Sequence, residues 1–179
     1  MSLVIHFVLF VLFSIFISCG SSSSDKNQEK AANGPVKTAA PVVSDKHILL
    51  PASNFYIIPP EGFTINKYSQ SLGKENENGY GANFIPMTII TGYTTEKHIS
   101  GVKAESQNKY PGVWKEELLT VSGVPAKICR YQAVPGVRMY HLFFLDKWND
   151  QSLIANYDET DETSGEAMRN ALKTVIVRQ

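Results

Sequence analysis

The chain has 179 residues with 17 basic and 17 acidic side chains, so its formal net charge is zero. A nucleic-acid-binding protein normally presents a basic face, and nothing in this charge balance points to one. The sequence contains neither a glycine-rich phosphate loop nor a serine in a nucleophile-elbow motif, so it carries no motif of the common nucleotide-binding and serine-hydrolase classes.

An uncharged apolar stretch covers residues 3–17. As a helix it would be roughly 22 Å long. This is short of the hydrocarbon core of a bilayer and suits the apolar part of an export signal. The run Phe16-Ile17-Ser18-Cys19, followed by Gly20 and four serines, resembles the lipobox of bacterial lipoproteins. The resemblance implies a signal peptide at residues 1–18 and a diacylated Cys19 as the mature N-terminus.

Acylation of Cys19 would decide where the protein resides. Two acyl chains such as palmitate anchor a protein stably in a membrane, so we expect a membrane-anchored protein of the cell envelope, in the outer membrane, facing the periplasm or the outside. An uncleaved N-terminal anchor and ordinary signal-peptide cleavage are the alternatives. With Cys19 acylated, the other cysteine, Cys129, has no partner for an intramolecular disulfide.

Residues 20–46 are poor in apolar side chains and contain no aromatic residue. Such a composition cannot bury enough surface to offset the entropy of ordering. We therefore predict lipidated Cys19 and a flexible tether at residues 19–46, with a coil that spans roughly 30 Å. The remaining residues 47–179 are enough for one domain with a single core.

The first half of this domain shows short apolar and β-branched runs. They predict strands at residues 48–50, 55–58, 63–68 and 84–91. The residues rich in Gly and Asn at 69–83 predict a long loop. Thr94 or Thr95 can cap a helix that runs to Tyr110, and Pro111-Gly112 ends it.

The second half predicts an antiparallel meander and a final helix. Short turns separate four strand-like segments at residues 113–121, 124–134, 137–146 and 151–157. Both faces of the third segment are largely apolar, so we expect it to be central in a sheet that is covered on both sides. Thr163 and Glu166 form a capping-box pattern, and an apolar stripe from Met168 to Val175 predicts a C-terminal helix across the sheet.

The order of these elements predicts the α+β class, with an antiparallel sheet of about six strands sandwiched by helices. Two motifs stand out: Pro59-Pro60-Glu61-Gly62-Phe63 after an extended segment, and Val121-Ser122-Gly123-Val124-Pro125-Ala126 at the first meander turn. Together with the element order they resemble the PsbP-like fold over roughly residues 48–177. That group includes an extrinsic protein of photosystem II, a Ran-binding factor and many small bacterial lipoproteins, and the resemblance implies no enzyme activity. A cystatin-like or NTF2-like sheet around one helix is the alternative fold.

His141 is the histidine for which a chemical role can be formulated. If it shared a pocket with Cys129 on the neighbouring strand, a thiol–imidazole pair could form, since a nearby imidazolium lowers the pKa of a thiol. The alternative is a cysteine packed as a small hydrophobic residue and a histidine at the sheet surface. The acidic run at residues 158–162 lacks the spacing of a calcium loop and is expected to complement the N-terminal end of the last helix. We expect no metal and no cofactor.

Aromatic side chains are the other candidates for binding. Trp148 lies in a polar turn, where a large ring either marks a contact surface or packs back onto the loop, and Tyr140 is the second candidate partner-binding residue. We therefore expect a lipid-anchored, monomeric protein with a non-catalytic protein-binding or accessory domain. Its partner would be an envelope protein or an external macromolecule. The alternative is a small-molecule binder or weak hydrolase with a pocket near Cys129 and His141.

Overall fold

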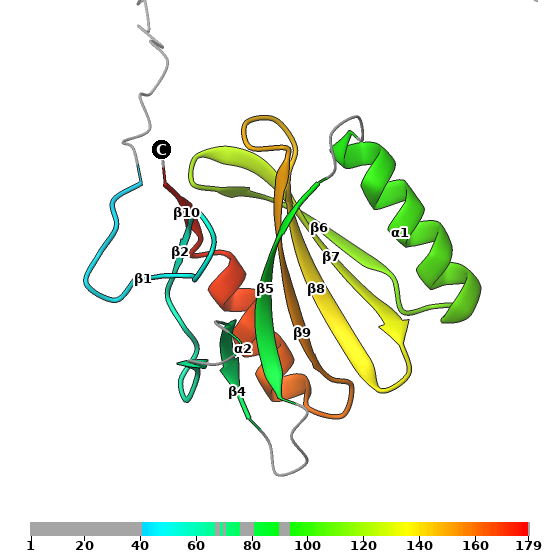
Figure 1. The fold of residues 1–179 in the computed structure, drawn as a ribbon. Coiled ribbons are helices and arrows are strands. Elements are labelled where there is room, and N and C mark those ends of the chain that lie inside the picture. Colours follow the sequence, from blue (N-terminus) through cyan, green and yellow to red (C-terminus); the bar gives the residue numbers. More distant parts are fainter. Residues whose placement is uncertain (1–40, 67–68, 70, 76–80, 90–93, 179) are drawn as a thin grey trace, which may run out of the picture. The chain divides into compact units, whose positions relative to one another are not determined.

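The computed structural model describes residues 41–66, 69, 71–75, 81–89 and 94–178. The predicted signal peptide, Cys19 and most of the predicted tether lie outside these residues. The described part belongs to one compact unit, Lys37–Gln179. It contains two antiparallel sheets and two helices (Figure 1), which confirms the predicted α+β class.

The larger sheet has seven strands among the described residues, in the order β3-β4-β5-β9-β8-β7-β6. They are β3 (Thr64–Asn66), β4 (Ser71–Lys74), β5 (Ala82–Thr88), β6 (Lys115–Val121), β7 (Val124–Val134), β8 (Val137–Phe144) and β9 (Gln151–Asp158). Strands β6 to β9 form the predicted meander, and β8 has the predicted central place in it. At the β6–β7 turn Ser122 and Gly123 have φ values of 54° and 76°, as a tight two-residue hairpin turn requires.

A second sheet of three strands joins the two ends of the domain. Its order is β1-β2-β10, with β1 (Ile48–Leu49), β2 (Phe55–Ile57) and β10 (Ile176–Val177). The prediction of a single sheet was therefore wrong, whereas the larger sheet is close to the predicted size. Strand β10 was not predicted, because a strand of two residues is too short to show a periodic pattern of apolar residues. Its partners in β2 also lie at the opposite end of the domain sequence.

Part of the loop predicted at residues 69–83 forms strand β4. Leu72 is fully buried and pairs with Phe84 of β5. Gly73 allows the two strands to approach closely, since a Cβ atom at this position would lie 2.9 Å from the carbonyl oxygen of Ala82. The loop prediction was wrong for these residues because burial and close pairing outweigh the low strand propensity of their neighbours.

Helix α1 (Thr95–Lys109) begins where the sequence predicts it. The side-chain oxygen of Thr94 accepts a hydrogen bond from the backbone N–H of Lys97 at 3.2 Å, and the helix ends before Pro111. Neither α1 nor α2 (Glu162–Leu172), the two helices of the described residues, is long and apolar enough to cross a membrane.

Helix α2 begins two residues earlier than the capping-box pattern predicts. Asp161 caps it by accepting the backbone N–H of Ser164 at 3.0 Å, so Thr163 lies inside the helix. The capping-box prediction was wrong because aspartate caps a helix as well as threonine does, and because Glu166 accepts a hydrogen bond from Tyr140 instead. Asp161 and Glu162 confirm that the acidic run complements the helix N-terminus.

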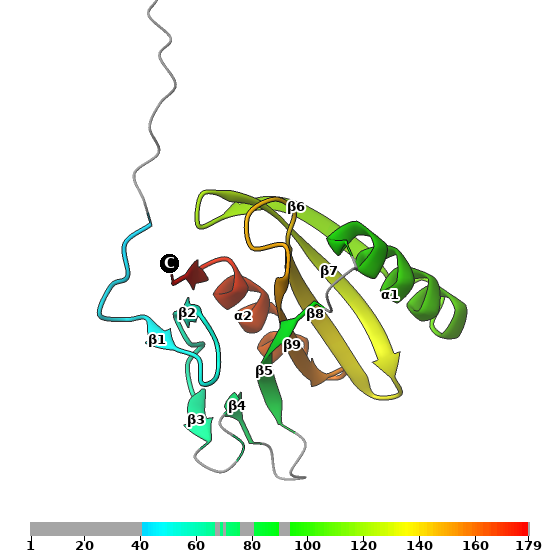
Figure 2. The same cartoon turned by 45° about the horizontal axis from the view of Figure 1, so that its top comes forward.

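The two helices cover opposite faces of the larger sheet (Figure 2). Successive residues of β8 alternate between these faces. Leu142 and Phe144 belong to the main core on the α2 side, whereas Phe143 belongs to a smaller cluster on the α1 side and packs against His141. Both faces of β8 are thus covered, as its sequence predicts.

Candidate ligand-binding groove

A cavity of about 280 Å³ lies between α1 and the larger sheet. Its apolar lining comes from one side chain of α1 and from four strands, namely Val102, Met87, Ala133, Met139 and Ile154. Polar residues line the same cavity, among them His98, Ser106 and His141. We call this cavity the α1 groove. An apolar lining with a few polar groups is typical of ligand-binding sites.

His141 lies at the floor of the α1 groove on β8 and is only 1% exposed. Its Nδ1 atom lies 3.2 Å from the hydroxyl oxygen of Tyr131 on β7. Its ring is packed against Phe143 with a centroid distance of 3.8 Å, and the ring of His98 on α1 meets it edge-on at 5.9 Å. The Nε2 atom is buried and has no hydrogen-bond partner among the described residues.

The α1 groove holds its histidines in the neutral form. Burial, and to a lesser extent the neighbouring His98, lowers the pKa of His141 to about 3. Burial also lowers the pKa of His98. An imidazole that stays neutral at pH 7 donates through one ring nitrogen and accepts through the other, so His141 can take part in a hydrogen bond without adding a charge to the cavity.

Ser106 contributes a second polar atom to the α1 groove. It lies on the sheet-facing side of α1, is 2% exposed, and its Oγ atom has no hydrogen-bond partner among the described residues. In the sequence Ser106 continues the apolar stripe of Ile99 and Val102. The sequence therefore shows a serine at a position where α1 should face the core, which could have marked it as a candidate site residue. Only the folded structure shows that Ser106 lines the same cavity as His141.

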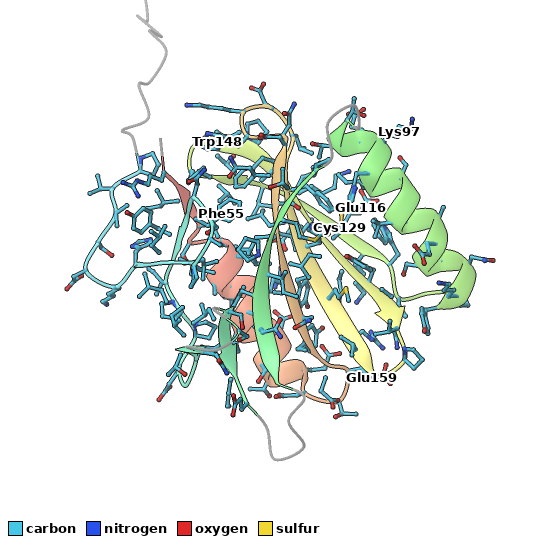
Figure 3. The ribbon with its side chains drawn as sticks, viewed as in Figure 1. Phe55, Lys97, Glu116, Cys129, Trp148 and Glu159 are labelled. Carbon is cyan, nitrogen blue, oxygen red and sulfur yellow. The ribbon has the colours of Figure 1, made fainter. Side chains whose placement is uncertain are left out.

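Cys129 lies on β7 directly opposite His141 in the strand register, so the structure brings the two predicted residues together on one face of the sheet. The thiol is free and fully buried, in the layer between the sheet and α1 (Figure 3). Burial raises its pKa to about 12. A thiol with such a pKa stays protonated at neutral pH and is a poor nucleophile, so its surroundings are those of a packed core cysteine.

Trp148 lies in the turn between β8 and β9 (Figure 3). It is half-buried, and its ring meets Phe144 edge-on with a centroid distance of 5.7 Å. The Nζ atom of Lys147 lies 4.7 Å from the centre of the same ring. The side chain therefore packs partly onto the main core and leaves the rest of its surface at the turn.

Tyr140 faces the α2 side of the sheet and is only 4% exposed. Its hydroxyl donates a hydrogen bond to Glu166 at 2.9 Å, and its ring stacks on Tyr157 at 5.6 Å. A second cavity of about 320 Å³ beside it is bordered by Arg130, Arg169 and several carboxylates. Both arginines are engaged in ion pairs, Arg130 with Glu162 and Arg169 with Glu117 and Glu166. Tyr140 thus has the contacts of a core residue.

Within the described residues, His, Cys, Asp and Glu side chains form no group of three that could hold a metal ion. No protein-family model matches the chain, and no curated protein matches it significantly. Any function must therefore be argued from the residues and their geometry.

Proposed function

We propose that the chain is a lipoprotein of the cell envelope with a PsbP-like domain, anchored in the outer membrane through acylated Cys19. The proposal rests on the lipobox-like run that ends at Cys19, on the polar residues that follow it, and on the strand–helix–meander–helix order of the domain. On this proposal residues 1–18 are removed as a signal peptide, and residues 20–46 tether the domain at roughly 30 Å from the bilayer.

We further propose that the domain is a non-catalytic binding module whose partner is another envelope protein. The observation that supports this proposal is that α1 covers only part of its face of the larger sheet. On β5, Ile85 is 41% exposed and Met87 is 38% exposed. Their register with Ile154 and Ser152 of β9 places them on the same face as His141. An apolar sheet face beside a groove is typical of a contact surface, and the short tether limits the partners to the envelope.

Site-specific photo-crosslinking in intact cells tests this binding face. A photoreactive side chain at Met87 should give a discrete adduct with another protein, because this position borders the α1 groove. Val134, which is 47% exposed at the β7–β8 turn, is the matched control and should give none. Adducts from position 134 and none from position 87 would contradict the proposed face.

The anchor is tested separately by metabolic labelling with palmitate. Cys19→Ala should abolish incorporation of the label, and Ser18→Tyr should leave the precursor unprocessed. Unchanged labelling of Cys19→Ala would contradict lipidation at this residue and favour an uncleaved anchor or ordinary cleavage.

Protease accessibility on intact and permeabilised cells decides on which side of the membrane the domain lies. Digestion on intact cells would place it outside, and the partner would then be an external macromolecule. Protection until permeabilisation would place it in the periplasm, as a partner in the envelope requires.

A second candidate function is the binding of a small molecule in the α1 groove. It is favoured by the two buried polar atoms, His141 Nε2 and Ser106 Oγ, that line the groove without a partner among the described residues. The hydrolase alternative near Cys129 and His141 has less support, because the thiol is buried and its pKa is raised to about 12.

A further inference from the structure

The tautomer of His141 follows from its neighbour Tyr131. The Tyr131 hydroxyl is buried, and among the described residues its hydrogen-bond partner is His141 Nδ1 at 3.2 Å. The hydroxyl is neutral, because burial raises the pKa of Tyr131. If it accepted from an Nδ1–H group, its own proton and the unprotonated Nε2 would both lack a partner among the described residues, so it donates to Nδ1. A neutral imidazole that accepts at Nδ1 carries its own proton at Nε2. The buried Nε2 atom is therefore a hydrogen-bond donor.

The α1 groove thus presents two donors without acceptors. One is the Nε2–H of His141, and the other is the hydroxyl of Ser106, which can also accept. Neither reaches an acceptor among the described residues, and buried donors in native proteins are nearly always paired. A ligand that brings an acceptor oxygen would satisfy them, whereas a purely apolar ligand would leave both unpaired.

The charges around the α1 groove determine whether a charged or a neutral acceptor group binds better there. Its lining is largely apolar, and the carboxylate in that lining, Glu105, is paired with Lys109 at 2.7 Å. His141 and His98 lack a positive charge at neutral pH, because burial lowers the pKa of both. A carboxylate would lose its hydration on entering the groove and would find no positively charged side chain to pair with, which is unfavourable. A neutral carbonyl group is therefore the better acceptor.

We infer that the α1 groove binds a small neutral carbonyl compound, an amide or ester with a short apolar chain, whose oxygen accepts hydrogen bonds from His141 Nε2–H and Ser106 Oγ–H. Its chain lies against Val102, Met139 and Ile154. The cavity of about 280 Å³ limits the ligand to a small molecule. This inference rests on the second candidate function.

The tautomer is tested first, without any ligand. The full chain, labelled with ¹⁵N-histidine and reconstituted in lipid nanodiscs, should show His141 protonated at Nε2 and unprotonated at Nδ1. The assignment comes from the His141→Phe variant, in which these resonances disappear. In Tyr131→Phe the preference for this tautomer should weaken, because the donor to Nδ1 is lost. An Nδ1-protonated His141 in the unsubstituted protein would overturn the inference.

Binding is tested with hexanamide as the probe. Hexanoate and hexylamine, which also have six carbon atoms but carry a negative and a positive charge, are the controls. Hexanamide should shift the His141 Nε2 resonance in a saturable way, with a dissociation constant in the millimolar range expected for so small a ligand. Hexanoate and hexylamine should bind at least about tenfold more weakly. Empty nanodiscs control for partition of the probe into lipid.

Ser106→Ala provides the variant that leaves the fold intact, because alanine is the best helix former. It should weaken hexanamide binding about three- to tenfold, the range expected for one lost hydrogen bond. No saturable shift, equal binding of hexanamide and hexanoate, or unchanged binding in Ser106→Ala would each overturn the inference and leave water as the occupant of the groove. Crosslinking from position 87 reads out the protein partner independently, so the two proposals can fail separately.

Discussion

The two faces of the larger sheet are covered in different ways. On the α2 side, residues from both sheets and from α2 form one continuous buried core, which includes Leu142, Phe144 and Leu172. On the α1 side, a smaller cluster around Phe143 contains a cysteine and a tyrosine and packs beside His141. There the cover ends at the α1 groove and leaves Ile85 and Met87 of β5 exposed.

The difference lies in how closely each helix approaches the sheet. In α2, Gly165 packs on the ring of Tyr157, and a Cβ atom at this glycine would lie 2.4 Å from the ring. In α1, Ile99 is the one buried apolar side chain, whereas α2 buries Met168, Ala171 and Leu172. Helix α2 is therefore held by the core, whereas α1 covers part of a face that keeps room for a ligand. Five predictions test this contrast.

The largest effect is expected from Leu172→Ala on α2. Leu172 is fully buried in the main core, and its truncation should lower the free energy of unfolding by about 4 kcal/mol. Ile99→Ala on α1 is the matched substitution and should cost only about 2 kcal/mol, the low end of the range for such truncations. Urea unfolding measures both, and equal costs would contradict the contrast between the two sides.

Gly165→Ala should be destabilising although alanine favours helices. The added methyl group would overlap the Tyr157 ring, and overpacking of this kind costs about 1–3 kcal/mol. Thermal unfolding measures the loss. If the substitution were neutral or stabilising, α2 would not be in close contact with β9.

The α1 side should make stability depend on pH through its buried histidine. Burial lowers the pKa of His141 from 6.5 to about 3. Between these two pH values its imidazole is therefore protonated in the unfolded chain and neutral in the folded chain. This contribution is complete above pH 6.5 and is lost as the pH falls towards 3. Between pH 6.5 and 5 it amounts to about 1.5 kcal/mol.

Urea unfolding at these two pH values measures that loss. His141→Phe should remove most of it and leave the smaller share of His98, whose pKa is also lowered by burial. Glutamates with a lowered pKa, such as Glu116, add to the loss near pH 5 in both proteins, so the difference between the two proteins reports the histidine. An unchanged pH dependence in His141→Phe would contradict the burial of a neutral imidazole on the α1 side.

Trp148→Ala tests how much a side chain at the edge of the α2-side core contributes to stability. Because the ring packs edge-on against Phe144 and is half-buried, its removal should cost about 1 kcal/mol, well below the loss for a fully buried tryptophan. Calorimetry would detect this change. If stability were unchanged and partner capture were weakened, Trp148 would act as a contact residue.

The smallest effect is expected at Gly101, and it has the opposite sign. An alanine there meets no neighbouring atom and removes the helix-destabilising glycine, so stability should rise by about 0.5–1 kcal/mol. A loss of stability in the same thermal assay would show that α1 lies closer to another part of the chain than the structure indicates.

Local signals in the sequence sufficed for the elements that local contacts define. The turn at Ser122-Gly123 and the cap at Thr94 were predicted, because each depends on residues a few positions apart. Strand β10 and the pairing of Leu72 in β4 were not predicted, because they depend on partners that the chain reaches only after folding. The candidate site divides in the same way: His141 was noticed from its strand, whereas Ser106 and Tyr131 join it only in the tertiary structure.

By itself, the sequence determined the α+β class and the meander, since hydrophobic period and turn chemistry act over a few residues. It also predicts the acylated Cys19 and the tether, which remain predictions outside the described residues. Only the tertiary structure decided that Cys129 and Tyr140 are buried, and that one face of the sheet is left partly open. These outcomes depend on how closely each helix packs against the sheet, and that distance is set by side chains far apart in the chain.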